Sequence, residues 1–128
     1  MTAPIRLHLP YPPSANDLWT VVHGRIVRTE RYRRWKQAAA WAVTADRKRA
    51  RVLGPYELEI RVARPDESRR DLDNLVKSLS DAIQAGGAIT NDHFAQRITL
   101  EWDPSVEGVV VLILPTHDRY EERQHGEH

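Results

Sequence analysis

Residues 71–87 read DLDNLVKSLSDAIQAGG, and this stretch decides how the rest of the chain is interpreted. Apolar residues recur in it at helical spacing, which predicts a helix from about Asp73 to Ala85. The buried face of this helix consists of Leu75, Leu79, Ala82 and Ile83. Gly86-Gly87 is typical of a helix C-terminus, because glycine tolerates the left-handed conformation that ends many helices. The helix is therefore expected to begin beside two aspartates and to end at a glycine pair.

Strands are predicted on both sides of this helix. Apolar and polar residues alternate in residues 5–9, 56–62 and 98–102, which predicts strands with one buried face. Residues 108–114 form a continuous, mostly β-branched run, which is typical of a strand buried on both faces. These strands are expected to form the sheet on which the helix packs.

The segment before residue 56 predicts a hairpin and a second helix. The hairpin is expected to turn at His23-Gly24. Thr29 is the expected N-cap of a helix that runs to about Ala50, with Tyr32 and Trp35 on its apolar face. The fold class is therefore α+β, a single domain with a mixed β-sheet packed against two main helices.

The domain is expected to span residues 1–116 and to be followed by a polar tail, residues 117–128, that we expect to be disordered. A chain of 128 residues is long enough to bury one core. It has no cysteine, which excludes disulfides and thiolate metal sites and is compatible with a reducing cytosol. The longest apolar run, Val109 to Leu114, is too short to cross a membrane.

The net charge of +1 hides a strongly basic region. Residues 25–51 contain ten basic and two acidic residues, a local charge of +8. Such a region is suited to holding a polyanion such as DNA. The alternative is a solvated basic helix without a partner, and charge alone does not separate the two.

Asp71 and Asp73 are the candidate metal ligands. Their spacing in an extended segment points both side chains to the same side, while Leu72 points the other way. Asp73 is also a favourable N-cap, and Lys77 follows it by one helical turn. Carboxylates are the ligands that Mg²⁺ prefers, and a bound Mg²⁺ makes water a stronger acid. The pattern alone has an equal alternative, in which the aspartates only cap the helix and form ion pairs.

Three separated motifs resemble the RusA family of Holliday junction resolvases. The first is Arg69-Arg70-Asp71-Leu72-Asp73-Asn74 with Lys77. The second is Leu9-Pro10-Tyr11-Pro12-Pro13-Ser14-Ala15-Asn16, and the third is Asn91-Asp92. The resemblance runs from about Ile5 to Pro115 and includes the order of the elements. One departure is Asp17, which stands where a basic residue is expected and would weaken a contact with DNA.

The resemblance implies a RusA-like homodimer that nicks two strands of a four-way DNA junction symmetrically with Mg²⁺ or Mn²⁺, in DNA recombination and repair. The catalytic residues carried over are Asp71, Asp73, Asp92 and Lys77, and the three aspartates are the metal ligands. The expected location is the cytoplasm of a bacterial or phage-infected cell. The expected DNA-binding residues are Arg69, Arg70, Asn74, Asn16, Arg31, Arg34 and Lys48. For Asn74 a purely backbone-capping role is equally plausible.

Asp92 poses a question of reach. A helix from Asp73 to Ala85 is about 20 Å long, and the residues from Gly86 to Asp92 extend at most about 20 Å. Asp92 therefore rejoins the start of the helix only if this segment runs straight back along it. Otherwise the aspartate comes from the other subunit of a dimer. We favour a site within one chain, since Gly86-Gly87 permits a sharp reversal.

Other polar and aromatic residues are expected to have structural roles. His93 is interpreted as exposed or structural, Asp81 as part of the helix surface, and Trp35 and Trp41 as core or dimer interface. Rival functions are a nuclease for other branched DNA, for DNA ends or for RNA, a non-catalytic DNA-binding dimer, and a dimeric scaffold without a nucleic-acid role.

Overall fold

In the computed structural model of the chain, residues 3–14, 17–65 and 73–116 are described, and the description of Asp73 and Asn74 covers the backbone only. Asp71, Arg69, Arg70, Asn16 and the tail at 117–128 therefore lie outside the described residues. The elements in chain order are β1 (Ile5–Leu9), β2 (Trp19–Val22), β3 (Arg25–Arg28), α1 (Glu30–Arg47), β4 (Tyr56–Val62), α2 (Asp73–Ala85), the short 3-10 helix η2 (Asp92–Phe94), β5 (Ala95–Trp102) and β6 (Val109–Pro115).

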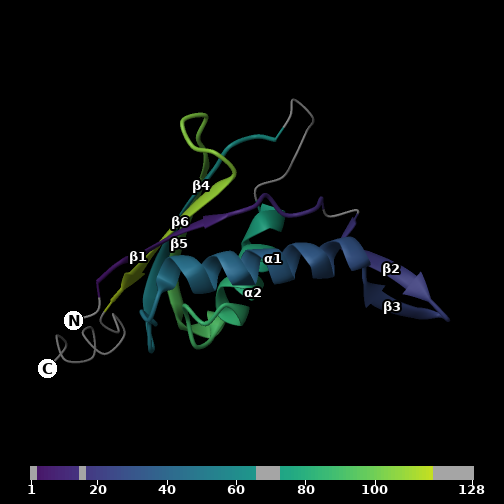
Figure 1. The fold of residues 1–128 in the computed structure, drawn as a ribbon, viewed down its shortest axis with the longest axis horizontal. Helices are drawn as coiled ribbons and strands as arrows, with labels where there is room; N and C mark the ends of the chain where they lie inside the picture. Colours follow the sequence, from purple (N-terminus) through teal and green to yellow (C-terminus); the bar gives the residue numbers. More distant parts are fainter. Residues whose placement is uncertain (1–2, 15–16, 66–72, 117–128) are drawn as a thin grey trace, which may run out of the picture.

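The main sheet has four strands in the order β1-β6-β4-β5 (Figure 1). β4 pairs with β5 in parallel, while the pairs of β6 with β1 and with β4 are antiparallel. Two parallel neighbours need a crossover connection, and α2 lies in the chain between β4 and β5. The predicted α+β class with a mixed sheet and two main helices is confirmed.

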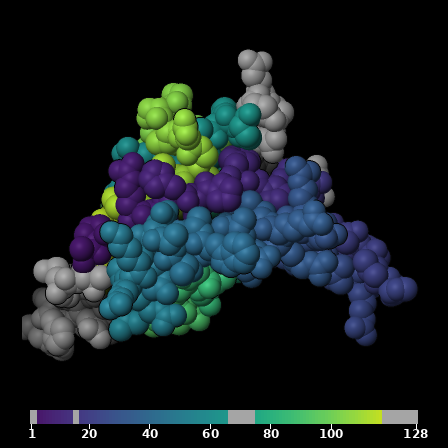
Figure 2. All heavy atoms as spheres, viewed as in Figure 1, coloured from purple at the N-terminus to yellow at the C-terminus, as the bar shows by residue number. Residues whose placement is uncertain are grey.

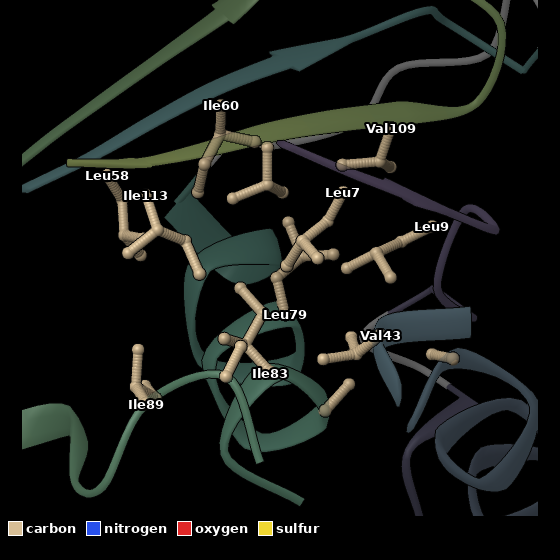
Figure 3. Close-up of a cluster of buried hydrophobic side chains, with 14 of the residues drawn as sticks. Leu7, Leu9, Val43, Leu58, Ile60, Leu79, Ile83, Ile89, Val109 and Ile113 are labelled. Atoms are coloured by element: carbon tan, nitrogen blue, oxygen red, sulfur yellow. The ribbon is translucent and has the colours of Figure 1, made fainter. Parts of the chain in front are cut away.

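One face of the sheet forms the core together with both helices. Figure 3 shows Leu7, Leu58, Ile60 and Ile113 from the strands pointing toward Leu79 and Ile83 of α2 and Val43 of α1. Burial alternates along β1 and β4, because successive strand residues point to opposite faces. The core thus fixes which side of α2 faces the sheet and which side carries its polar residues.

The expectation that β6 is buried on both faces is only partly met. Val109, Val111 and Ile113 are fully buried, whereas Leu112 and Leu114 are half-buried. These two residues lie on the second face of the sheet, opposite the one on which α1 and α2 pack. The β-branched run at 108–114 therefore did indicate a strand inside the sheet, but it did not indicate full burial of both faces of that strand.

The hairpin forms a separate two-stranded sheet of β2 and β3 that projects from one end of the molecule (Figures 1 and 2). Its turn is at His23-Gly24, where both residues have positive φ (51° and 76°) as a tight hairpin turn requires. The hairpin exposes large apolar side chains, namely Trp19, Val21, Val22 and Ile26. We call these four residues the hairpin patch.

The first helix begins as predicted and ends earlier than predicted. The Thr29 side chain accepts a hydrogen bond from the backbone N–H of Tyr32 at 3.1 Å, which confirms the expected N-cap. α1 ends at Arg47 and not near Ala50, because Lys48 leaves helical geometry with φ 56°. Among the described residues, no helix is both long and apolar enough to cross a membrane.

Candidate active site

Asp92 lies beside the polar side of α2. Its carboxylate Oδ2 is 3.4 Å from the Lys77 Nζ, and its backbone N–H donates to the Gln84 side-chain oxygen at 3.3 Å. Lys77 follows Asp73 by four residues, which corresponds to a rise of about 6 Å along the helix. The segment after α2 therefore does run back along the helix within one chain, as the reach argument required.

Close packing between α1 and the end of α2 makes this reversal possible. A Cβ at Gly86 would lie 2.5 Å from the Val43 Cβ and 2.7 Å from the Ala40 carbonyl oxygen, so only glycine fits there. Gly87 has φ 84°, a conformation that side chains disfavour. The glycine pair thus serves a close helix–helix approach in addition to ending the helix.

Two arginines hold the reversed segment in place. Arg47 Nε donates to the Gly86 carbonyl at 2.7 Å, and Arg51 Nε donates to the Gly87 carbonyl at 3.0 Å. A parallel bridge between Val52 and Ile89 continues the attachment. Part of the basic region therefore has a structural role, which sequence reasoning missed because the acceptors are backbone carbonyls distant in sequence.

The surroundings of Asp92 fix its backbone and leave its carboxylate accessible. Asn91 caps η2 by accepting a hydrogen bond from the His93 N–H at 3.0 Å, and the Tyr56 hydroxyl donates to the Asp92 carbonyl at 3.5 Å. Burial, and secondarily the charge of Asp92, raise the pKa of Tyr56 to about 12, so its hydroxyl remains a donor at neutral pH. The Asp92 side chain is 39% exposed, which leaves room for a further ligand.

Lys77 is held by two carboxylates. Its Nζ is 3.3 Å from Asp81 Oδ1 and 3.4 Å from Asp92 Oδ2. The hydrogen bond and charge of Asp81, and then those of Asp92, raise the pKa of Lys77 above its usual value. Lys77 is therefore an ammonium at neutral pH, and it lies where a bound anion beside Asp92 would meet it.

Asp81 is less exposed than its assignment to the helix surface predicted. Its side chain is only 20% exposed and accepts a hydrogen bond from the Tyr32 hydroxyl at 3.2 Å. The Arg28 guanidinium also lies 3.9 Å from its Oδ2. The Lys77–Asp81 spacing was visible in the sequence, but Tyr32 and Arg28 come from α1 and β3, so their approach depends on the tertiary fold.

Of the expected catalytic residues, the structure brings Lys77 and Asp92 together. Asp71 lies outside the described residues, and Asp73 and Asn74 begin α2 with their side chains undescribed. The parts of the chain that are described contain no cluster of three His, Asp or Glu side chains able to hold a metal ion. The three-carboxylate site therefore stays a prediction.

Three of the expected DNA-binding residues lie at the two ends of α1. Arg31 and Arg34 are exposed in its first turns, where they pair with Asp17 at 3.3 Å and Glu30 at 2.6 Å. Lys48 is exposed at the opposite end. Arg31 also borders an open groove of about 520 Å³, which Ser14 and Pro65 line as well. The proline-rich segment and Pro65 therefore lie near the basic N-terminal end of α1.

The aromatic and histidine assignments are resolved case by case. Trp35 is buried and its Nε1 donates to the Pro10 carbonyl at 2.9 Å, which confirms a core role. Trp41 is exposed and so is not part of the core. His93 is exposed and its ring lies 4.1 Å from that of Phe94, as expected for a structural residue.

Comparison with known proteins identifies the family to which this chain belongs. Residues 10–113 match the family described as endodeoxyribonuclease RusA, and the chain belongs to this family of DNA-cutting enzymes. A relative is the crossover junction endodeoxyribonuclease RusA of Aquifex aeolicus (strain VF5), which is 28% identical over 105 residues. This alignment covers 80% of the present chain and 83% of the relative.

Proposed function

We propose that this protein is a metal-dependent endodeoxyribonuclease that resolves four-way DNA junctions by paired symmetric nicks, in DNA recombination and repair. The observation that carries the proposal is the meeting of Asp92 with Lys77, one helical turn after Asp73. Within a family of endodeoxyribonucleases, a carboxylate beside an ammonium at the start of a helix is suited to a phosphate-cutting site.

The chemistry of the donor set fits Mg²⁺ or Mn²⁺. Asp71, Asp73 and Asp92 would hold the ion, since all three offer carboxylate oxygens and the Asp92 carboxylate is accessible. When bound, the ion would supply Lewis acidity at the phosphate and make water a stronger acid. Gln84 and Tyr56 would keep Asp92 in place through its backbone.

The chain's own cations would bind and orient the DNA. Lys77 would stabilise charge that develops on the phosphate, because its ammonium already lies at the carboxylate of Asp92. Arg31, Arg34 and Lys48, together with Arg69, Arg70, Asn16 and Asn74, would contact the backbone of the junction arms. Arg31 and Arg34 would exchange their exposed ion pairs with Asp17 and Glu30 for phosphates.

We further propose that the protein acts as a homodimer in the cytoplasm of a bacterial or phage-infected cell. Paired nicks on a symmetric junction need two active sites related by a two-fold axis. The hairpin patch supports a dimer, because large apolar side chains gathered on one projecting element are typical of interaction surfaces.

A cleavage assay tests the proposal. Synthetic four-way junctions, flaps, linear duplex and RNA of matched length are incubated with the protein at equal salt, with Mg²⁺, Mn²⁺ or EDTA. We expect symmetric nicks in the junction with either ion, no product with EDTA, and none with Asp73→Asn or Asp92→Asn.

Other outcomes of the same assay would replace the proposal. Faster cutting of flaps would favour a nuclease for other branched DNA. Junction binding without cleavage under every ion would favour a non-catalytic DNA-binding dimer. Binding that is insensitive to salt, or no binding, would contradict a role at DNA phosphates.

A further inference from the structure

Asp81 forms contacts that the proposed cleavage chemistry leaves unexplained. It lies one turn after Lys77 on α2, and its Oδ1 is 3.3 Å from the Lys77 Nζ. Its other oxygen accepts from the Tyr32 hydroxyl at 3.2 Å and lies 3.9 Å from Arg28. The Asp81 carboxylate therefore links the Lys77 ammonium to Tyr32 of α1 and Arg28 of β3.

The partners of Asp81 are themselves fixed. Tyr32 lies in the first turn of α1 and is buried in the core. The Arg28 guanidinium lies between two aromatic rings, 3.8 Å from the centroid of Trp19 and 4.3 Å from that of Tyr32. Asp81 is thus fixed by contacts with Arg28 of the hairpin and Tyr32 of α1, and it in turn contacts the Lys77 ammonium.

This arrangement differs from an ordinary helix-surface ion pair. In the i,i+4 pair of Arg34 and Glu30 on α1, both side chains are mostly exposed. In the pair of Lys77 and Asp81, the lysine is 69% exposed but the carboxylate is only 20% exposed. A lysine has four rotatable side-chain bonds, so a fixed carboxylate one turn away restricts where its ammonium lies.

We propose that Asp81 is a positioning residue that holds the Lys77 ammonium at Asp92, with Tyr32 and Arg28 fixing its carboxylate. The inference rests on the proposed function, because it assigns Asp81 a part in placing a group that acts on the scissile phosphate. It predicts that loss of Asp81 slows cleavage and leaves the affinity for the junction nearly unchanged, since the Asp81 carboxylate is only 20% exposed and is engaged by residues of this chain.

The test measures single-turnover cleavage of a four-way junction with Mg²⁺ and, separately, junction binding without a divalent ion. Asp81→Asn is expected to lower the cleavage rate by about ten- to a hundredfold and to change the dissociation constant by less than about twofold. Tyr32→Phe removes one hydroxyl and is expected to lower the rate by about three- to tenfold. Glu101→Gln, which breaks the exposed pair with Arg61 on the sheet, is the control and is expected to cleave like the wild type.

A double-mutant cycle separates positioning from a merely structural role. If Asp81 acts through Lys77, Asp81→Asn has no further effect on the rate in a Lys77→Met protein. Reactions are followed for days with protein in excess, so that slow variants give a rate. Should Asp81→Asn fail to show a cooperative thermal transition, Tyr32→Phe takes its place in the same cycle.

Two results would overturn the inference while leaving the proposed function intact: an unchanged cleavage rate in Asp81→Asn, or an equal loss of rate with and without Lys77. A wild-type protein that cuts no junction with Mg²⁺ or Mn²⁺ would refute the proposed function, and the inference would fall with it.

Discussion

Asp92 illustrates how single residues are placed in this protein. Its carboxylate contacts Lys77, its N–H contacts Gln84, and its carbonyl contacts Tyr56. The short segment from Gly86 to Asp92 limited where Asp92 could lie. The glycine pair in the sequence indicated that this segment could turn back along α2. The contact with Tyr56 could not be predicted, because it depends on the start of β4 lying under η2.

Tyr56 gives a prediction about stability at alkaline pH. Burial raises its pKa from 10.0 to about 12 in the folded protein. The folded state thus keeps a proton that the unfolded state loses, so this contribution to stability is complete below pH 10 and is lost as the pH rises toward 12. The loss amounts to at most about 1.4 kcal/mol for each pH unit.

The measurement is urea unfolding of the wild type and of Tyr56→Phe between pH 8 and 11. We expect the free energy of unfolding of Tyr56→Phe to fall less steeply above pH 10 than that of the wild type. If the free energies of unfolding of the two proteins fall in parallel above pH 10, the Tyr56 pKa is not raised by folding and the prediction is wrong.

Asp81 marks a limit of prediction at the residue scale. Its four-residue spacing from Lys77 was evident, and a surface ion pair was the simplest interpretation. Its burial arises from Tyr32 and Arg28, which lie about fifty residues earlier in the chain. Periodicity shows which face of a helix is buried, but it does not show which residues of other elements contact that helix.

At the scale of elements, α2 and its exit segment depend on Gly86. Gly86→Ala would place a Cβ 2.5 Å from that of Val43, so α1 and α2 must move apart. We expect a loss of about 1–3 kcal/mol in the free energy of unfolding, measured by urea titration. We also expect slower junction cleavage, because Asp92 is positioned by the segment that follows.

Ala85→Ser, at the exposed neighbouring position, is the matched control and is expected to stay within about 0.5 kcal/mol of the wild type. A Gly86→Ala protein as stable as the control would contradict the close approach of the two helices.

The first turns of α1 give a prediction about DNA binding. Arg31→Ala with Arg34→Ala removes two exposed cations. The slope of log affinity against log salt should become shallower by about 0.9 for each phosphate that the protein no longer neutralises. Binding titrations at several salt concentrations measure this slope. Arg97→Ala, at an exposed position on the second face of the sheet, is the control, and an equal change in its slope would refute α1 as the DNA-binding element.

The helices and strands themselves were largely predictable, because burial of one face imposes a period of 3.6 or 2 residues on the sequence. α2 was predicted at its observed bounds, and the strands at 5–9 and 56–62 agree as well. The end of α1 was placed near Ala50 because residues 48–50 are compatible with a helix. The positive φ of Lys48 that ends it has no sequence signal comparable to a glycine.

At the scale of the whole molecule, the sheet order could not be derived from the sequence. Strand periodicity does not state that β6 lies between β1 and β4, or that β4 and β5 run parallel. It also overestimated the burial of β6, since an aliphatic run does not show whether the second face is covered. The participation of Asp71 and Asp73 in the proposed metal site likewise stays a prediction.

The hairpin patch predicts the oligomeric state. We expect light scattering to give a mass of about twice the 14.8 kDa of one chain. Ile26→Glu places a charge where a side chain is 72% exposed, and it is expected to shift the protein toward the monomer. Leu53→Glu, at another exposed apolar residue, is the control. A wild type that is monomeric at micromolar concentration, or an Ile26→Glu protein that stays dimeric, would contradict this interface.

The central claim is that Asp71, Asp73 and Asp92 of one chain bind a divalent ion beside Lys77. Crystals soaked in Mn²⁺ test it most directly, because the anomalous signal locates the ion independently of the protein atoms. We expect a peak within about 2.0–2.6 Å of carboxylate oxygens of Asp71, Asp73 and Asp92 in the same chain. The absence of a peak at Asp92, or separate ions at Asp73 and Asp92 too distant to share a phosphate, would contradict the claim.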